Sequence, residues 1–546
     1  MLAIGRRLAR RYLVPMITQE ILRGGALLVA VALSVACSRS PPPDQQTPAV
    51  MATHKHSDAP GINWYAGEVG DAFAAARSAH KPILLYWGAS WCPPCQQLKS
   101  TVFSRSDFIN KSRLFIPVYL DGDDAGAQKW GEQFRVTGYP TVVVLNADAH
   151  ELMRIAGGMD LSAYATVLDT ALADLQPAAA LLEAVGVGKP LELAACRRLA
   201  FNAWQLGDLD DAAANARLAQ QLDVAAVQCP ASARLERARL QVFAASFSAQ
   251  AEADTLSGDQ PPSPALRARV DAVNRVVSNE RTAVEVADAL ESLDENFFRA
   301  VKAGATALPW LARFSRVMDA IAADPDYAEA DQLRAVTSKL KAIKTINGAV
   351  PAGAARAARA RVGAALADTQ IPYVRSGIIN AVLHIYDVLD QNELAYKVVQ
   401  GELRKTATPY YYKADLGELA EGLGRTEEAL KWYRESYAEA RGPATRFQWG
   451  RQYAISLLRL QPGDAARIRS VTADVLGELD GQDRIYRRAR ASLEALDQAL
   501  RKWDTDSKGA HHEVIVSLRD RMQQICAKIP KAEPAHASCE AFLASA

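Results

Sequence analysis

The sequence has almost no net charge and no dense cluster of basic residues interleaved with aromatic ones. Its 63 Lys and Arg residues are balanced by 62 Asp and Glu residues, which leaves a formal charge of +1 at pH 7. Proteins that hold nucleic acid by its phosphates rely on a concentrated positive surface. The composition therefore gives no indication of a nucleic-acid partner.

Apolar runs of membrane-spanning length are also missing near the N-terminus. The apolar and small residues at 24–36 fall short of the roughly 20 that a helix needs to cross a bilayer. Several arginines precede this stretch, and such an order is typical of an export signal. We therefore expect residues 1–37 to direct export and to be cleaved, with either Met1 or Met16 as the start.

The end of this segment, Leu-Ser-Val-Ala-Cys at 33–37, resembles a bacterial lipobox. The resemblance implies that Cys37 is lipidated and anchors a periplasmic protein to a membrane. Plain secretion into the periplasm and an uncleaved anchor are the alternatives. Residues 38–60 are rich in Pro, Ser, Gln and Thr, and such a composition predicts an extended linker without a core.

Cysteine is scarce, at seven residues, and two of the seven form a Cys-x-x-Cys pattern. The apolar run 83–87 has the length and residue types of a buried strand, and it leads to Cys92 and Cys95 at the start of a helical pattern. A helix N-terminus stabilises an anion, so Cys92 is predicted to react as a thiolate. Cys95 lies about one helical turn further on, where it can attack a mixed disulfide held on Cys92. The pattern indicates redox catalysis with Cys92 as nucleophile and Cys95 as resolving thiol.

Two prolines fill the positions between the cysteines. Pro93 suits the first helical position because its missing N–H would have had no partner there, and Pro94 restricts the backbone further. A zinc site would need a second Cys-x-x-Cys or a Cys/His cluster at ligand spacing, which the sequence lacks. A purely structural disulfide remains an alternative, although so short a loop gains little chain entropy.

Two motifs together resemble the thioredoxin fold. They are Trp-Cys-Pro-Pro-Cys at 91–95, after a buried strand, and Gly-Tyr-Pro-Thr at 138–141, before the apolar strand 142–145. The resemblance covers residues 62–175, and the segment 98–108 is similar to the periplasmic C-terminal domain of the thiol:disulfide interchange proteins.

This resemblance implies a cis-proline loop beside the two sulfurs. The cis-proline would be Pro140. The implied substrate-docking residues are Trp91, Pro93, Pro94, Tyr139 and Pro140. The family exchanges disulfides with protein partners and receives its redox equivalents from another protein, so the resemblance implies neither an organic cofactor nor a metal.

The sequence departs from cytoplasmic thioredoxins at a buried ion pair. Tyr86 stands where that family has an aspartate, and Pro117 stands near the position of its lysine partner. The ion pair that assists proton transfer at the second cysteine in that family is therefore expected to be absent here. Tyr139, in place of a small or aliphatic residue before the cis-proline, suggests a different partner preference.

The remainder of the predicted domain, 61–175, alternates strands and helices. We expect a short first strand at 62–65, a helix at 69–79, strands at 115–120 and 152–155, a turn at 157–158 and a closing helix at 161–175. The acidic segment 121–124 lacks the later acidic positions of a calcium loop, so we interpret it as the cap of a helix.

After residue 176 the sequence becomes rich in Ala, Leu, Arg and Glu, with apolar residues at helical spacing up to residue 546. Ala395 and Ala429 lie in similar segments, and the 34 residues between them equal the tetratricopeptide period. Segments 206–212 and 324–327 resemble further, degenerate units. Stacked repeats usually present a concave face to a protein partner. A plain helical bundle that supports the first domain is the alternative, and loops at 259–264 and 348–353 are expected to divide the region.

Four other cysteines are expected to form structural disulfides, which an oxidising periplasm permits. The predicted pairs are Cys196 with Cys229 and Cys526 with Cys539. The sequence thus predicts an α/β thioredoxin fold followed by a large all-α helical-repeat, tetratricopeptide-like region. The predicted function is an envelope thiol:disulfide oxidoreductase, with a reductase favoured. The rival is a helical scaffold whose thioredoxin-like module is redox-inert.

Overall fold

The computed structural model describes residues 61–546 except for short segments at 90, 157–160, 174–175, 187–189, 205–210, 259, 369–371, 407, 483, 532 and 545–546. The predicted signal with Cys37, the linker of residues 38–60 and the turn at 157–158 lie outside the described residues. So does most of the repeat-like segment 206–212. Among the described helices, none is both long and apolar enough to cross a lipid bilayer.

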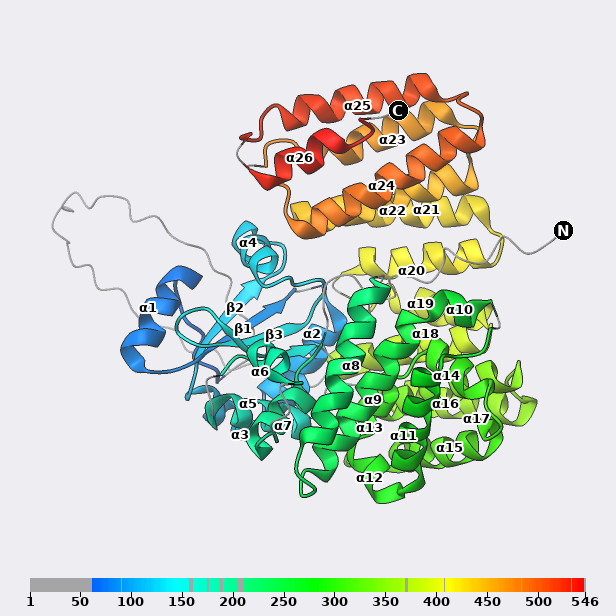
Figure 1. Cartoon of the computed structure of the whole chain (residues 1–546). Helices are drawn as coiled ribbons and strands as arrows, with labels where there is room; N and C mark the ends of the chain where they lie inside the picture. The colour runs from blue at the N-terminus through cyan, green and yellow to red at the C-terminus, as the bar shows by residue number, and fades with distance from the viewer. Residues whose placement is uncertain are drawn as a thin grey trace, which may run out of the picture.

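A four-stranded mixed sheet forms the centre of the first domain (Figure 1). Its strands are β1 (Ile83–Gly88), β2 (Ile116–Asp121), β3 (Thr141–Leu145) and β4 (Glu151–Ala156), in the order β2-β1-β3-β4. β1 runs parallel to β2 and antiparallel to β3, and β3 runs antiparallel to β4. Every residue of β1 is buried, as expected for a central strand covered on both faces.

Helices cover both faces of this sheet, and the hydrophobic clusters on its two sides are separate. The helices are α1 (Val69–Ala79), α2 (Pro93–Leu98), the π-helix η1 (Lys99–Phe103), α3 (Ser106–Ser112), α4 (Ala125–Gln133) and α5 (Leu161–Ala173). On one side Tyr86 and Phe103 pack with Tyr164 of α5, and on the other Phe73 of α1 and Phe134 pack with Trp87. The predicted α/β fold is confirmed, with α1 at the expected bounds.

The short strand expected at 62–65 is wrong. This segment is not in a strand, and Tyr65 makes a single bond to β2, from its backbone N–H to the carbonyl of Pro117 at 2.8 Å. Pro117 has no N–H to donate in return, so a β-ladder cannot continue along this edge. Ile62 and Trp64 are nevertheless buried, so the segment still contributes to the core.

The remainder of the described chain is helical, as expected. The helices up to the middle of this region are α6 (Ala178–Ala184), α7 (Leu193–Phe201), α8 (Ala212–Gln228), α9 (Arg234–Ala251), α10 (Ala253–Ser257), α11 (Pro264–Ser278), α12 (Glu280–Glu285), α13 (Ala287–Glu291), α14 (Glu295–Lys302), α15 (Ala307–Ala323), α16 (Glu329–Asn347) and α17 (Ala352–Asp368). Those that follow are α18 (Pro372–Val388), α19 (Asn392–Glu402), α20 (Pro409–Gly422), α21 (Thr426–Glu439), α22 (Pro443–Leu460), α23 (Ala465–Gly477), α24 (Arg487–Asp506), α25 (His512–Cys526) and α26 (Pro534–Ala541).

Two disulfides lie within the helical region. Cys196 at the middle of α7 is bonded to Cys229 at the end of α8, with a Cα–Cα distance of 5.9 Å. Cys526 at the end of α25 is bonded to Cys539 of α26, with a Cα–Cα distance of 5.7 Å. These are the two pairs named from the sequence.

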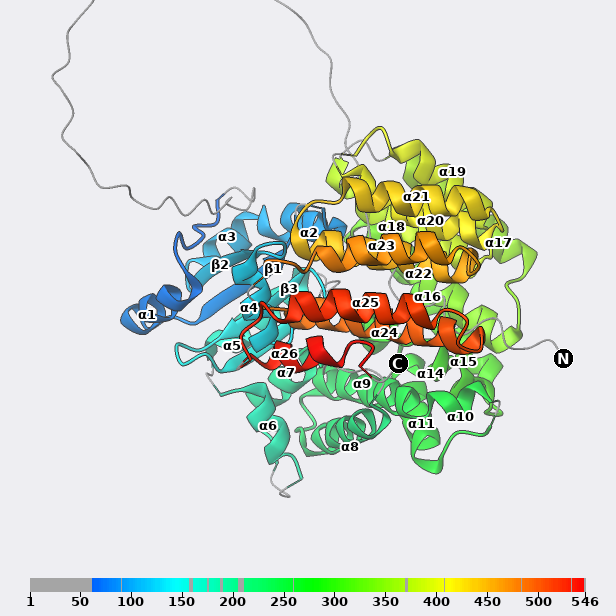
Figure 2. The same ribbon diagram turned by 90° about the horizontal axis from the view of Figure 1, so that it is seen from above.

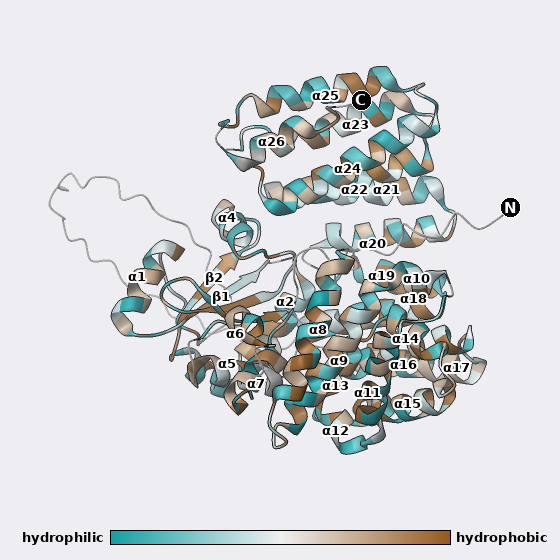
Figure 3. Ribbon diagram, in the orientation of Figure 1, coloured by the Kyte–Doolittle hydropathy of each residue, from teal (hydrophilic) through white to brown (hydrophobic). Residues whose placement is uncertain are grey.

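The helical region curves around the first domain, as the views from the side and from above show (Figures 1 and 2). α2 packs against α18, and α4 packs against α24. The strands of the sheet are among the more hydrophobic segments, and the surface helices show hydrophilic outer faces (Figure 3). The first domain therefore contacts helices far away in the sequence.

The open edge of β4 is covered by the segment that follows α7. The backbone N–H of Arg154 donates to the side-chain oxygen of Asn202 at 2.8 Å, and the N–H of Ala203 donates to the carbonyl of Arg154 at 2.9 Å. An unpaired strand edge invites pairing with other chains, so this cover protects the sheet.

Candidate redox site

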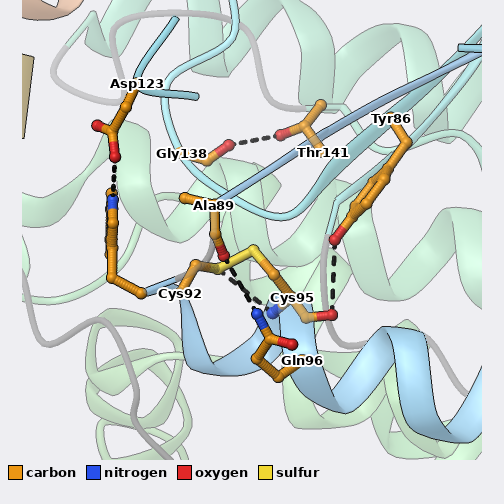
Figure 4. Close-up of a disulfide and its surroundings, with 9 residues drawn as sticks. Tyr86, Ala89, Cys92, Cys95, Gln96, Asp123, Gly138 and Thr141 are labelled. Carbon is orange, nitrogen blue, oxygen red and sulfur yellow. Dashed lines mark hydrogen bonds between the residues drawn. A yellow bond between two sulfur atoms is a disulfide. The ribbon is translucent and has the colours of Figure 1, made fainter. Parts of the chain in front are cut away.

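Cys92 and Cys95 form a disulfide at the N-terminus of α2 (Figure 4). Cys92 is the N-cap residue and Pro93 takes the first helical position. The backbone N–H of Cys95 points at the sulfur of Cys92, with a distance of 3.3 Å between nitrogen and Sγ. In the reduced form this N–H would stabilise a thiolate on Cys92, together with the helix dipole.

Tyr86 on β1 holds the backbone of the second cysteine. Its hydroxyl donates to the carbonyl oxygen of Cys95 at 3.5 Å, as Figure 4 shows. Burial raises the pKa of Tyr86 well above its ordinary value, and nearby Tyr119 and Tyr164 add to the effect. The phenol is therefore neutral at physiological pH and offers no ionised base beside Cys95. Gly88 leaves room for this ring, because a Cβ there would lie 2.5 Å from its hydroxyl.

The cis-proline loop lies at the same end of the sheet as the disulfide. Trp87 near the end of β1 pairs with Thr141 at the start of β3, because the two strands are antiparallel. The peptide bond between Tyr139 and Pro140 is cis, as the resemblance implied. Both motifs thus meet at one edge of the domain, although more than 40 residues separate them in the sequence.

Tyr139 is held in place by its hydroxyl. The hydroxyl donates to the carbonyl of Gly122 at 3.1 Å and accepts from the side-chain amide of Gln128 at 3.1 Å. Burial raises the pKa of Tyr139, against the lowering effect of the nearby Arg488 guanidinium. Gly122 has to lack a side chain, because a Cβ there would lie 2.3 Å from the tyrosine ring.

Asp123 is a residue of this site that the sequence did not reveal. Its Oδ2 accepts a 2.7 Å hydrogen bond from the indole nitrogen of Trp91, and its Oδ1 accepts from the hydroxyl of Thr445 on α22. Burial raises the pKa of Asp123, and the bonds from Thr445 and Trp91 work against that rise. The only sequence signal was the acidic segment 121–124. There Asp124 occupies the N-cap position of α4 without a side-chain capping bond.

Helices far along the chain complete the surroundings of Trp91. The ring of Tyr411 on α20 stacks on the Trp91 ring, with 6.0 Å between centroids and 27° between planes. The guanidinium of Arg488 on α24 lies 5.5 Å from the centroid of Trp91 and 4.9 Å from that of Tyr139. An arginine over an aromatic face is an attractive contact.

The residues predicted to dock a substrate do lie together, but they are covered. Trp91, Pro93 and Pro140 are buried, and Pro94 and Tyr139 are partly buried. Neither Cys92 nor Cys95 has any solvent-exposed surface. The sequence predicted which residues form this site, but it did not indicate that the helical region lies over them.

A family model agrees with the fold of the first domain. Residues 69–172, from α1 into α5, match a family model described as a thioredoxin-like domain. Among solved structures, a thioredoxin from Thermus thermophilus is 24% identical, with 20% of this chain and 88% of that chain covered and a TM-score of 0.19. A structure described as a DsbH oxidoreductase is 23% identical, with 24% and 95% covered and a TM-score of 0.19. No curated protein matches the chain significantly. The disulfide of Cys92 and Cys95 thus belongs to a thioredoxin-like domain.

Proposed function

We propose that this chain is a thiol:disulfide oxidoreductase of the bacterial cell envelope that reduces disulfides in protein partners. The observation that carries the proposal is the Cys92–Cys95 disulfide at the N-terminus of α2, at the end of the sheet where the cis peptide before Pro140 also lies. A thioredoxin-like family model matches the segment that holds both features.

The proposed reaction starts from the reduced pair. The Cys92 thiolate attacks one sulfur of a partner disulfide, forms a mixed disulfide and releases the partner's other sulfur as a thiolate. The Cys95 thiolate then attacks the sulfur of Cys92, closes the Cys92–Cys95 disulfide and releases the second partner thiolate. Two electrons pass to the partner, whose two thiolates take up protons. An upstream dithiol restores the pair by the reverse exchange.

The structure contributes two features to this chemistry. The backbone N–H of Cys95 is placed to stabilise the attacking thiolate of Cys92. The backbone at Tyr139 and Pro140 is proposed to pair with an extended partner segment, with Trp91, Pro93 and Pro94 as its neighbours.

The direction of electron flow is tested by a redox titration of the Cys92–Cys95 pair against dithiothreitol and glutathione buffers. A reduction potential near or below about −230 mV would place the pair among reductants such as thioredoxin. A value near about −120 mV would make it an oxidant and overturn the proposed direction.

The rival function is a helical scaffold with a redox-inert module. The complete burial of Cys92 and Cys95 favours this rival, because a buried disulfide cannot exchange with a partner. A Cys95→Ser variant separates the two functions, because Cys92 can then form a mixed disulfide that is not resolved. Partners trapped by this variant and lost with Cys92→Ser support the oxidoreductase. Equal capture of the same partners by a Cys92→Ser/Cys95→Ser variant would support the scaffold instead.

We also propose that the helices from α19 to α25 form tetratricopeptide-like repeats that bind protein. Two side-chain bonds join residues that are 34 apart, which is the period of these repeats. Gln452 donates to Glu418 at 2.7 Å, and Gln461 donates to Glu427 at 2.6 Å. Glu418 and Gln452 lie at the same position of α20 and α22, whose first residues, Pro409 and Pro443, are also 34 apart, so these two helices contact each other at equivalent positions, as in a stacked array.

The proposed location is the periplasm, with Cys37 as a lipidated anchor. It rests on the sequence of residues 1–37 alone. A Cys37→Ser variant is expected to move the protein from the membrane fraction to the soluble periplasmic fraction. An unchanged distribution would contradict lipid anchoring at this residue.

A further inference from the structure

The redox pair is completely enclosed in this structure. Cys92 and Cys95 have 0% exposed surface, and the neighbouring Trp91 has 4%. Thiol–disulfide exchange needs an incoming thiolate to contact one of the two sulfurs. A partner cannot do so while the surroundings stay as they are.

The helical region supplies the cover. The two cysteines belong to one hydrophobic cluster with residues of α18, α20 and α22. Tyr411 of α20 stacks on Trp91, and α18 packs directly on α2. The approach of α18 is close, since a Cβ at Gly377 would lie 2.4 Å from the side-chain oxygen of Gln97.

Polar contacts hold this cover at its rim. Arg490 of α24 pairs with Glu132 of α4 at 2.5 Å, and Thr445 of α22 donates to Asp123. Burial alone would raise the pKa of Glu132, but the bonds from Arg490 and Arg487 hold it below its ordinary value. The carboxylate is thus ionised at neutral pH and the pair is charged on both sides.

The interface has an apolar centre, where the two cysteines and Trp91 cluster with residues of α18, α20 and α22, and it has polar and charged contacts at its edge. Relative motion of domains is the default expectation unless the interface between them is large and wholly hydrophobic, and the Arg490–Glu132 pair and the Thr445–Asp123 bond make this one partly polar. The covered surface is also the one where the proposed partner segment would bind, at Tyr139 and Pro140. Cover and partner therefore compete for the same surface.

We propose that the face of the helical region formed by α18, α20, α22 and α24 is a lid over the redox site, and that exchange requires the lid to move away. The inference rests on the proposed oxidoreductase function. In the closed form the disulfide resists thiols. In the open form an external dithiol attacks Cys92, Cys95 leaves as a thiolate, and the donor's second thiol closes the donor disulfide. Two electrons thereby pass to the pair, which ends as two thiols.

The test is the rate at which dithiothreitol reduces each of the three disulfides of the full-length protein. Samples are quenched at intervals by alkylation and mapped by mass spectrometry. An Arg490→Met variant removes the ion pair to Glu132 and keeps a long side chain. We expect Cys92–Cys95 reduction to become up to about fivefold faster, which is the upper end of what one solvent-accessible ion pair contributes.

The matched control is Arg501→Met on the same helix, α24. Arg501 also binds a carboxylate through two nitrogens, but its partner is Asp497 of α24 itself. The rate for Cys92–Cys95 should stay within about twofold of the wild type in this control. Thr445→Val is a second variant at the lid, and it should act in the same direction as Arg490→Met.

The disulfide Cys196–Cys229 serves as the internal reference, because it is also buried but lies in a hydrophobic cluster separate from the one that holds Cys92 and Cys95. Faster reduction of Cys92–Cys95 alone supports the lid. Unchanged Cys92–Cys95 rates in both lid variants would overturn it, and so would an equal rise at all three disulfides, which indicates general unfolding.

Insulin reduction separates this inference from the proposed function. If the lid variants react faster with dithiothreitol but pass no electrons to insulin, the lid stands and the reductase function fails. If wild type and lid variants reduce insulin at equal rates, the function stands and the lid is wrong.

Discussion

Trp91 and Asp123 are joined by a 2.7 Å hydrogen bond from the indole nitrogen to Oδ2, and the same carboxylate receives the hydroxyl of Thr445 from α22. One carboxylate of the thioredoxin-like domain thus connects the residue next to Cys92 with a helix more than 300 residues away. A substitution at Asp123 is therefore expected to affect both the folding stability of the protein and the closure of the helical lid over the redox site.

An Asp123→Ala variant should lower the free energy of unfolding by about 1–3 kcal/mol, because it leaves the buried Trp91 N–H and Thr445 hydroxyl without an acceptor. Urea denaturation followed by circular dichroism measures this change. Asp124→Ala is the matched control, since Asp124 is exposed and makes no side-chain capping bond. Equal losses in the two variants would contradict the role given to Asp123.

A Gly122→Ala variant should displace Tyr139, because the new Cβ would lie 2.3 Å from its ring. We expect an overpacking cost of about 1–3 kcal/mol in thermal or urea unfolding. Gly126→Ala in α4 is the control, where no atom lies within 4 Å of an added Cβ and alanine is the better helix former. That variant should be neutral or slightly more stable. The contact would be unimportant if both variants behaved alike.

A Tyr86→Phe variant should change the reduction potential of Cys92–Cys95 by less than about 15 mV from the wild-type value. For this two-electron couple, about 15 mV corresponds to about 0.7 kcal/mol. The reason is that the hydroxyl bonds to the carbonyl of Cys95 and stays neutral at physiological pH. The measurement is a redox titration at several pH values. A larger shift whose size depends on pH would mean that the phenol takes part in proton transfer at Cys95.

A Glu418→Gln variant should change how stability depends on pH. Burial, and then the neighbouring Glu421, raise the pKa of Glu418 to about 7. The folded state therefore holds this proton more tightly than the unfolded chain, so the stability it contributes is present below about pH 4.5 and is lost as pH rises to about 7. The variant should be about 1–3 kcal/mol more stable than the wild type at pH 8, with little difference at pH 4.

The comparison of variant with wild type is necessary because His384 acts in the opposite direction. Burial lowers its pKa to about 4, so the stability it contributes is lost as pH falls from 6.5 to about 4. The difference between the two urea-denaturation profiles removes the contribution of His384 and reports Glu418 together with its charge effect on the buried Asp415, whose pKa is raised first by burial and then by Glu418. Parallel profiles from pH 4 to pH 8 would contradict the shift of the Glu418 pKa.

The local parts of the site could be predicted from sequence, because short-range patterns determine them. The apolar strand β1, the cysteine pair and the proline at the first helical position all lie within 83–95. The segment 62–65 shows the limit of such patterns. Its residue types favour a strand, but pairing depends on what its neighbour in the sheet offers, and Pro117 offers no N–H.

The cover over the site could not be predicted from sequence. Tyr411, Thr445 and Arg488 lie on three different helices, and their positions in the sequence carry no pattern that distinguishes a face packed on another domain from one packed within the repeats. Asp123 was visible only as part of an acidic turn. Its bonds to Trp91 and Thr445 arise from tertiary packing, which brings together residues 32 and 322 positions apart.

The cover on β4 bears on how this protein can be dissected. Asn202 and Ala203 occupy the strand edge through Arg154, although they lie well beyond α5. A truncated form that ends after α5 would leave that edge unpaired and would expose the aromatic rings of Trp91 and Tyr139 at the same time. Such a fragment should self-associate through strand pairing and surface hydrophobicity. An assay on the isolated fragment would then report on aggregates. Measurements on the redox site should therefore use a protein that keeps the helical region after α5.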